Sequence, residues 1–265
     1  MNSASKKAIL VVSFGTSYEN TRKLTIEAIE HDIADAFPAC PTYRAWTSKM
    51  IIAKLKKRDG LTIHTVKEAL EQMLLDGITD VIVQPTHVIN GIENDQMKAD
   101  ALSFRDRFSS IAFGNPLLTT EEDNQAIVRV VADEFRDMDP DTALVLMGHG
   151  TEHYANTVYA ALDYRFKDTG HKNIFLGTVE AYPALDSLLR AADSFHPKKI
   201  VLAPFMIVAG DHAQNDLAGA DPDSWMNRLS SEGYEVTPVL KGLGEYPQVR
   251  QILVEHVQQA MNASV

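Results

Sequence analysis

Nine histidines give this chain of 265 residues its main capacity for acid–base and metal chemistry. Most of them need no chemical role, because they lie on predicted polar helix faces or in loops: His31, His64, His171, His196 and His256. His149 is different, because it directly follows an apolar run and stands between Gly148 and Gly150. Flanking glycines let the backbone turn sharply and let a bulky ligand approach. An imidazole placed there can bind a metal ion or take up a proton near neutral pH.

Two further polar residues follow later apolar runs, at intervals of about one strand–helix unit. They are Glu180 and His212. Because the carboxyl ends of parallel strands meet at one edge of a sheet, we expect both side chains to converge with His149. Two imidazoles and one carboxylate suit a divalent metal such as Fe, Co, Ni or Zn, and three protein ligands leave coordination positions open. The sequence therefore predicts an open metal site, although no short motif such as His-Glu-x-x-His supports it.

The first half of the chain does not repeat this set. Phe14 stands where the second half has His149, and Glu93 aligns with His212. We therefore expect one half to hold the metal and the other half to form a wall for the substrate. His87 follows another apolar run and has two readings, a cleft residue or a packed histidine. The residues expected to contact the substrate are Ser13, Phe14, Gly15, Thr16, His87, Gly148 and Gly150.

Several other chemistries are excluded. Neither a Gly-x-Gly-x-x-Gly nor a P-loop motif is present, and no Gly-x-Ser-x-Gly elbow supports a serine hydrolase. The single cysteine, Cys40, rules out an internal disulfide, a cysteine-rich zinc site and an iron–sulfur cluster. It lies between two prolines and is interpreted as an incidental loop residue. No organic cofactor is expected.

Short apolar runs alternate with amphipathic helices along the chain, which predicts an α/β fold with parallel sheets covered on both faces. Helix starts are indicated by capping boxes at Thr65–Glu68 and Thr119–Glu122. The predicted strands are residues 8–14, 81–85, 111–113, 143–147, 174–179, 200–204 and 236–239.

This pattern restarts near the middle of the chain. Residues 10–16 parallel 145–151, and residues 80–91 parallel 199–210. The polar stretch 137–141 is the expected linker. We therefore predict two similar α/β domains, 1–138 and 139–265, with a ligand cleft between them. The alternative that the terminal helix packs on the other domain stays open.

Composition narrows the classes of partner. The formal net charge is −11 and the pI is near 5.2, so the general basic surface of a nucleic-acid-binding protein is absent. An anionic substrate needs a local positive site against this field. No run reaches the roughly 20 apolar residues of a membrane helix. Lys6-Lys7 before an apolar run weakly resembles a signal peptide but has no cleavage site, so the cytoplasm is expected.

In combination these residues resemble the CbiK-type anaerobic cobalt chelatases, which are sirohydrochlorin cobaltochelatases of the class II chelatase group. The resemblance spans nearly the whole chain and implies a chelatase-like fold of two similar domains around a tetrapyrrole cleft. The family's metal-binding His, Glu and His fall on His149, Glu180 and His212. The segments that carry the resemblance are 10–17, 50–55, 87–91, 116–118, 147–150, 179–183, 208–216 and 242–245.

The resemblance implies ATP-independent insertion of Co²⁺ into sirohydrochlorin in anaerobic cobalamin synthesis, with release of two protons. The alternatives are the same reaction with Fe²⁺ or Ni²⁺, a haem-pathway ferrochelatase, or a non-catalytic carrier of metal or tetrapyrrole. Sirohydrochlorin carries eight carboxylates, for which Arg44, Lys49 and Lys54 are candidate partners; an ordinary solvated face is their other reading. The sequence leaves the oligomeric state open, a homo-oligomer being one alternative.

Overall fold

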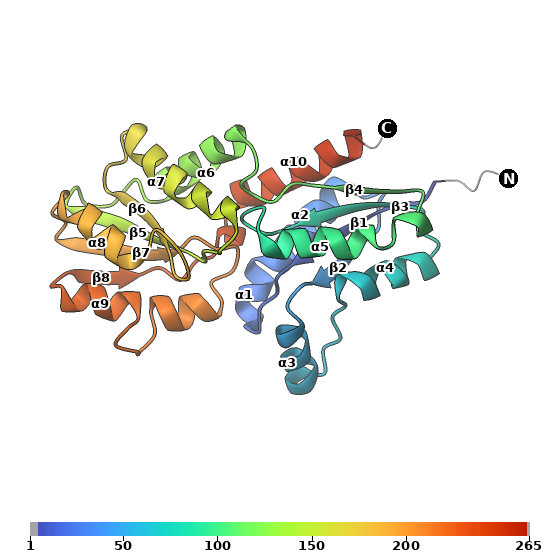
Figure 1. Ribbon diagram of the computed structural model, residues 1–265, viewed down its shortest axis with the longest axis horizontal. Coiled ribbons are helices and arrows are strands. Elements are labelled where there is room, and N and C mark those ends of the chain that lie inside the picture. The colour runs from blue at the N-terminus through green and yellow to red at the C-terminus, as the bar shows by residue number, and fades with distance from the viewer. Residues whose placement is uncertain (1–4, 264–265) are drawn as a thin grey trace. The chain divides into compact units, whose positions relative to one another are not determined.

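The computed structural model describes residues 5–263 and divides the chain into two compact units (Figure 1). The first comprises residues 1–119 and 246–265, and the second comprises residues 120–245. Each unit contains a four-stranded parallel sheet flanked by helices. The predicted α/β class with two similar domains is therefore confirmed. Among the helices of residues 5–263, none combines the length and hydropathy that crossing a bilayer requires.

The sheet of the first unit has the strand order β2-β1-β3-β4. Its strands are β1 (Lys7–Ser13), β2 (Thr42–Trp46), β3 (Asp80–Pro85) and β4 (Ser110–Phe113). The central strand β1 is almost continuously buried because both of its faces are covered. Parallel pairing sets Ser13 beside Trp46, so the carboxyl ends of β1 and β2 lie level.

Helices cover both faces of this sheet. They are α1 (Glu19–Leu24), α2 (Ile26–Ala36), α3 (Lys49–Asp59), α4 (Val66–Leu75), α5 (Ile92–Leu102) and α10 (Pro247–Ala263), with a short 3₁₀ turn η1 (Arg105–Arg107). Apolar residues of α4 and α5 join alternate residues of β1, among them Leu10 and Val12, in one core cluster. The terminal helix α10 contacts α2, β3 and β4.

The second unit repeats the topology, with the strand order β6-β5-β7-β8. Its strands are β5 (Thr142–Gly148), β6 (Ile174–Thr178), β7 (Lys199–Pro204) and β8 (Glu235–Pro238). All seven residues of β5 are buried. Its pairing sets Gly148 beside Thr178 and Met147 beside Pro204, so three carboxyl ends reach one edge.

The helices of this unit lie on opposite faces of its sheet (Figure 1). Leucines of α8 and the indole of Trp225 on α9 pack in one cluster with β5 residues. On the other face α7 contacts β6 and α6. The helices are α6 (Glu121–Glu134), α7 (Thr157–Asp168), α8 (Leu185–Asp193) and α9 (Trp225–Ser231), with short turns η2 (Tyr154–Asn156), η3 (Ala213–Leu217, a π-helix) and η4 (Leu243–Glu245).

Two local features differ from the sequence prediction. Strand β2 was not predicted, because Thr42–Trp46 is a partly exposed edge strand with Arg44 at its centre rather than an apolar run. The second capping box is formed by Thr120 and Asp123, one residue later than the predicted pair Thr119–Glu122. The first capping box, Thr65 with Glu68, is confirmed.

The units also divide the chain at a different place from the predicted boundary at 138/139. Helix α6 precedes the polar stretch 137–141 and belongs to the second unit. Its buried residues Ile127, Val128 and Val131 explain this, since an amphipathic helix belongs to the core that covers its apolar face. The terminal helix α10 belongs to the first unit, where it contacts α2.

Candidate metal site in the second unit

His149 is placed by the sharp turn that ends β5. Gly150 has a φ of +87°, a conformation that L side chains rarely adopt. A Cβ on Gly150 would lie 2.9 Å from the backbone nitrogen of Ala181, so only glycine lets the two loops approach. The turn leaves the His149 side chain 40 % exposed beyond the end of a wholly buried strand.

Glu180 is held beside His149 by main-chain hydrogen bonds. The Val179 N–H donates to the Gly148 carbonyl at 3.0 Å, and the Glu180 N–H donates to the His149 carbonyl at 2.9 Å. These bonds continue the β5–β6 pairing past the ends of both strands. The carboxylate of Glu180 projects into solvent and is 52 % exposed.

His212 comes from the loop that follows β7. The Phe205 N–H donates to the Met147 carbonyl, which keeps this segment beside β5 past the end of β7. The chain then forms the π-helix η3, which His212 directly precedes. Short π-helical turns occur frequently at functional sites.

The three predicted ligands converge within this one unit. One possible ligand atom from each of His149, Glu180 and His212 lies within 4.8 Å of the others. The two imidazole rings are 4.6 Å apart between centroids and nearly perpendicular. Each Glu180 oxygen lies 3.8 Å from one imidazole: Oε2 from Nδ1 of His149, and Oε1 from Nε2 of His212.

Hydrogen bonds at Nδ1 set the proton positions on both rings. Nδ1 of His149 lies 2.8 Å from the Gly150 carbonyl, which can only accept, so this nitrogen donates. Nδ1 of His212 lies 2.6 Å from Oδ2 of Asp216 and donates to that carboxylate. In the neutral imidazoles, Nε2 is therefore the atom with a free lone pair.

This arrangement can bind a divalent cation loosely. Ligand atoms at about 2.1 Å from one ion lie at most about 4.2 Å apart, so separations of up to 4.8 Å must shorten by at most about 0.6 Å for the three residues to share an ion. Two nitrogens and one carboxylate leave further positions open. The site is also half-exposed, which suits an ion that must be delivered onward rather than retained.

Asn156 joins the loops that carry His149 and Glu180. Its Oδ1 accepts a hydrogen bond from the Thr151 N–H at 3.0 Å, and its Nδ2 donates to the Tyr182 carbonyl at 2.6 Å. Neither Asn156 nor Asp216 was predicted as a site residue. The spacing of Asp216 four residues after His212 was the available signal, since residues four apart on a helix are neighbours.

The remaining residues predicted to contact substrate are mostly buried. Gly148 and Gly150 close the turn, and Gly148 packs against the Tyr159 ring, where a Cβ would lie 2.6 Å from the nearest atom. In the first unit Ser13 and Thr16 are 1 % and 3 % exposed, and Gly15 packs against the Trp46 ring. Phe14 is 45 % exposed and is the member of this group whose side chain can reach a ligand.

His87 is half-buried as a residue. Its ring nitrogens are buried and make no hydrogen bond of ordinary geometry within residues 5–263. Burial lowers the pKa of His87 to about 4, while Glu93 and Asn94 oppose this shift weakly. At neutral pH the ring is therefore uncharged.

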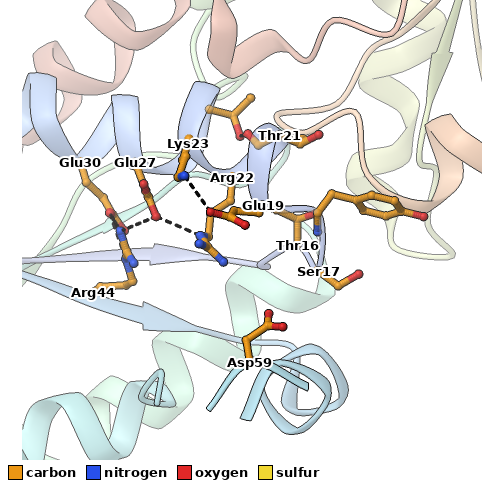
Figure 2. A network of polar contacts seen from close by, with 12 residues as sticks. Thr16, Ser17, Glu19, Thr21, Arg22, Lys23, Glu27, Glu30, Arg44 and Asp59 are labelled. Carbon is orange, nitrogen blue, oxygen red and sulfur yellow. Dashed lines mark hydrogen bonds and ion pairs between the residues drawn. The ribbon is translucent and has the colours of Figure 1, made fainter. Parts of the chain in front are cut away.

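The basic residues predicted to bind carboxylates divide into two kinds. Arg44 is paired with Glu30 and lies 3.7 Å from Glu27, so its charge is balanced by carboxylates of the same unit (Figure 2). Burial raises the pKa of Glu30, and hydrogen bonding to Glu30 raises the pKa of Arg44. Lys49 and Lys54 are exposed on α3 and keep their charges at the surface.

Comparison with known proteins identifies similar sequences over the full length. Residues 7–262 match the family model described as cobalt chelatase (CbiK). The chain is 39 % identical over 260 residues to the sirohydrochlorin cobaltochelatase of Salmonella typhimurium, covering 98 % of each chain. It is 32 % identical over 265 residues to the sirohydrochlorin cobaltochelatase CbiKC of Nitratidesulfovibrio vulgaris, covering 97 % of this chain and 92 % of the relative.

Solved structures share the fold at low sequence identity. SirB from Bacillus subtilis with Fe³⁺ superposes with a TM-score of 0.66 and 14 % identity, over 98 % of this chain and 97 % of SirB. CbiX, described as the terminal enzyme of sirohaem biosynthesis in denitrifying bacteria, gives a TM-score of 0.56 at 16 % identity, over 96 % and 99 % of the two chains. These likenesses concern the fold.

Proposed function

Since this chain belongs to the cobalt chelatase (CbiK) family, we propose that it catalyses the insertion of Co²⁺ into sirohydrochlorin. Both curated relatives described above carry that activity in their names, and each is matched over more than nine-tenths of its length. The observation in this chain that supports the proposal is the convergence of His149, Glu180 and His212 at one sheet edge. The resemblance inferred from the sequence is confirmed by this family membership.

In the proposed reaction the metal ion is a substrate. His149, Glu180 and His212 bind Co²⁺ through two imidazole nitrogens and a carboxylate, and the open positions accept the pyrrole nitrogens of the macrocycle. Weak three-ligand binding favours transfer, because the ion must exchange protein ligands for tetrapyrrole nitrogens. No organic cofactor and no ATP take part.

Insertion replaces two pyrrole N–H protons with the metal, so two protons must leave. As the ion moves onto the macrocycle, the lone pair on Nε2 of His149 becomes free to accept one of them. His212 and Glu180 offer further acceptors within the same cluster. His149 is thus both a ligand and the principal base in this proposal.

The tetrapyrrole is expected to contact residues outside the trio. Phe14 offers an exposed aromatic face, and Lys49 and Lys54 on α3 offer positive charge to the substrate's carboxylates. Ser13, Gly15, Thr16 and the two turn glycines can contribute only through their backbone or by shaping the turns. A cytoplasmic location stays a prediction, and the oligomeric state stays open, a homo-oligomer being one alternative.

One assay separates the insertion of Co²⁺, Fe²⁺ or Ni²⁺ from one another and from a non-catalytic carrier role. The protein is incubated anaerobically with sirohydrochlorin and Co²⁺, Fe²⁺ or Ni²⁺ in turn, and the absorption spectrum of the macrocycle is followed. Imidazole and carboxylate ligands accept all three metals, so the rates decide the preferred ion. Many turnovers per chain with Co²⁺ are expected. Product equal only to the amount of protein would instead indicate a carrier.

The site itself is tested by His149→Ala. This variant is expected to lower kcat/KM at least about 100-fold, because it removes a metal ligand and a proton acceptor together. His171→Ala is the matched control, since it removes a half-buried loop histidine of the same unit. Turnover by H149A close to that of the unsubstituted protein, with both variants folded by circular dichroism, would remove this site from the proposal.

A further inference from the structure

Asp216 makes the shortest contact to either imidazole of the trio. Its Oδ2 lies 2.6 Å from Nδ1 of His212, a distance typical of a charge-assisted hydrogen bond. Asp216 lies on the π-helix η3, four residues after His212. One short helical segment therefore supplies both the imidazole and the carboxylate that holds it.

We propose that Asp216 is a positioning residue that fixes His212 as a metal ligand. The hydrogen bond keeps the proton on Nδ1 and aims the lone pair of Nε2 toward Glu180, whose Oε1 is 3.8 Å away. The proposal rests on the proposed function, because it assigns Asp216 to the same Co²⁺ site.

The two histidines are held differently. Nδ1 of His149 donates to the uncharged carbonyl of Gly150, a residue fixed in the turn, whereas Nδ1 of His212 donates to a carboxylate. A carboxylate on the distal nitrogen makes an imidazole a better electron donor to a metal. Metal binding by His212 therefore depends on a side chain that mutation can remove, while the partner of His149 is part of the main chain.

A structural role for Asp216 would be visible as a loss of stability. Its side chain is 47 % exposed, and such a surface hydrogen bond contributes little to folding. The expected effect of replacing Asp216 is therefore on the metal site and not on the fold. This difference makes the role testable with the metal alone.

The test compares Asp216→Ala and Asp216→Asn with the unsubstituted protein, using calorimetric titration with Co²⁺ in the absence of tetrapyrrole. D216A is expected to weaken Co²⁺ binding about 10- to 100-fold. D216N is expected to weaken it less, because an amide oxygen still accepts the Nδ1–H bond without the charge. Asp223→Asn is the matched control: it removes one exposed acid of the same unit and should leave the affinity unchanged.

A second readout follows the ring itself. The ¹⁵N chemical shifts of His212 in the metal-free protein are expected to report the Nδ1–H tautomer in the unsubstituted chain and in D216N, and its loss in D216A. Should D216A fail to fold, the Co²⁺ affinities of D216N and D223N are compared instead. A lower affinity of D216N supports the positioning role of Asp216, and equal affinities overturn it.

The outcomes separate this proposal from the one on which it rests. If D216A binds Co²⁺ with unchanged affinity while H149A and H212A do not, Asp216 has no positioning role and the metal site stands. If the unsubstituted protein, H149A and H212A all bind Co²⁺ equally, the metal site is wrong and the role of Asp216 is overturned with it.

Discussion

Burial separates the histidines that follow strands into two partly exposed rings and one ring whose nitrogens are buried. His149 and His212 keep 40 % and 31 % of their side chains exposed at a sheet edge. His87 follows β3 in the other unit with both ring nitrogens buried, and its pKa falls to about 4. The same residue type after a buried strand is thus a candidate ligand in two cases and a packed neutral ring in the third.

The low pKa of His87 predicts a pH dependence of folding. In the unfolded chain an ordinary histidine titrates near 6.5, so between pH 6.5 and 4 the unfolded state binds more protons than the folded state. The stability contributed by the neutral ring is complete above about pH 6.5 and is lost as the pH falls toward 4. His87→Phe should remove this pH dependence, whose total size between pH 6.5 and pH 4 is about 3 kcal/mol at most.

Urea unfolding between pH 4.5 and 7.5 measures this slope. His31→Gln is the matched control, because it removes a histidine from the exposed surface of α2. The assignment of a buried neutral ring would be contradicted by an H87F variant whose unfolding free energy changes with pH as steeply as that of the unsubstituted chain.

At the scale of elements, one turn shape is used twice. Gly15 after β1 and Gly150 after β5 both have positive φ, +104° and +87°, and both pack against the neighbouring strand or its loop. The residue before each glycine is left partly exposed: Phe14 in the first unit and His149 in the second. The repeat therefore preserves the turn and changes the chemistry that it presents.

Gly150→Ala tests how closely this turn is tied to the site. A left-handed conformation costs an alanine roughly 1–2 kcal/mol. At this turn the added Cβ would also lie 2.8 Å from Cβ of Thr178, beside the loop that carries Glu180. The expected loss of unfolding free energy is about 3 kcal/mol, together with weaker Co²⁺ binding.

Gly170→Ala provides the comparison. Gly170 also has a positive φ, +98°, but no atom lies within 4 Å of an added Cβ. Its substitution should cost only about 1 kcal/mol and leave Co²⁺ binding unchanged. Equal losses in thermal and urea unfolding for the two variants would show that the contact with the Glu180 loop contributes nothing.

At the scale of the whole molecule, charge works against the proposed substrate. A chain with a net charge of −11 repels a polycarboxylate, so binding needs local positive groups. Helix α3 offers them, since five of the residues in KMIIAKLKKRD are basic. Arg58 is paired with Asp59, which leaves the lysines of this helix as the main candidates.

Two charge reversals distinguish a local effect of α3 on substrate binding from a general effect of net charge. Lys54→Glu and Lys172→Glu change the net charge equally, but Lys172 precedes β6 and so lies toward the amino edge of its sheet. K54E should raise the KM for sirohydrochlorin several-fold at low salt and less at high salt, because screening shortens the reach of exposed charges. Equal KM values for both variants at every salt concentration would leave α3 without a role in binding.

The sequence by itself determined the repeated strand–helix pattern, the buried central strands, the two glycine turns and the residue types at the proposed metal site. These follow from local rules: apolar runs predict covered strands, and a glycine before or after a strand permits a sharp turn. The parallel arrangement then predicted that residues far apart in the chain would meet at one edge. Strand β2 was not predicted, because an edge strand with Arg44 at its centre lacks an apolar run.

Only the tertiary structure decided which polar groups are buried or paired with other residues inside the units. It buried Ser13, Thr16 and the nitrogens of His87, paired Arg44 with Glu30, and set Asp216 against His212. It also assigned α6 to the second unit and α10 to the first. The physical reason is that burial and hydrogen-bond partnership depend on contacts between distant segments, whereas periodicity and turn chemistry describe only neighbouring residues.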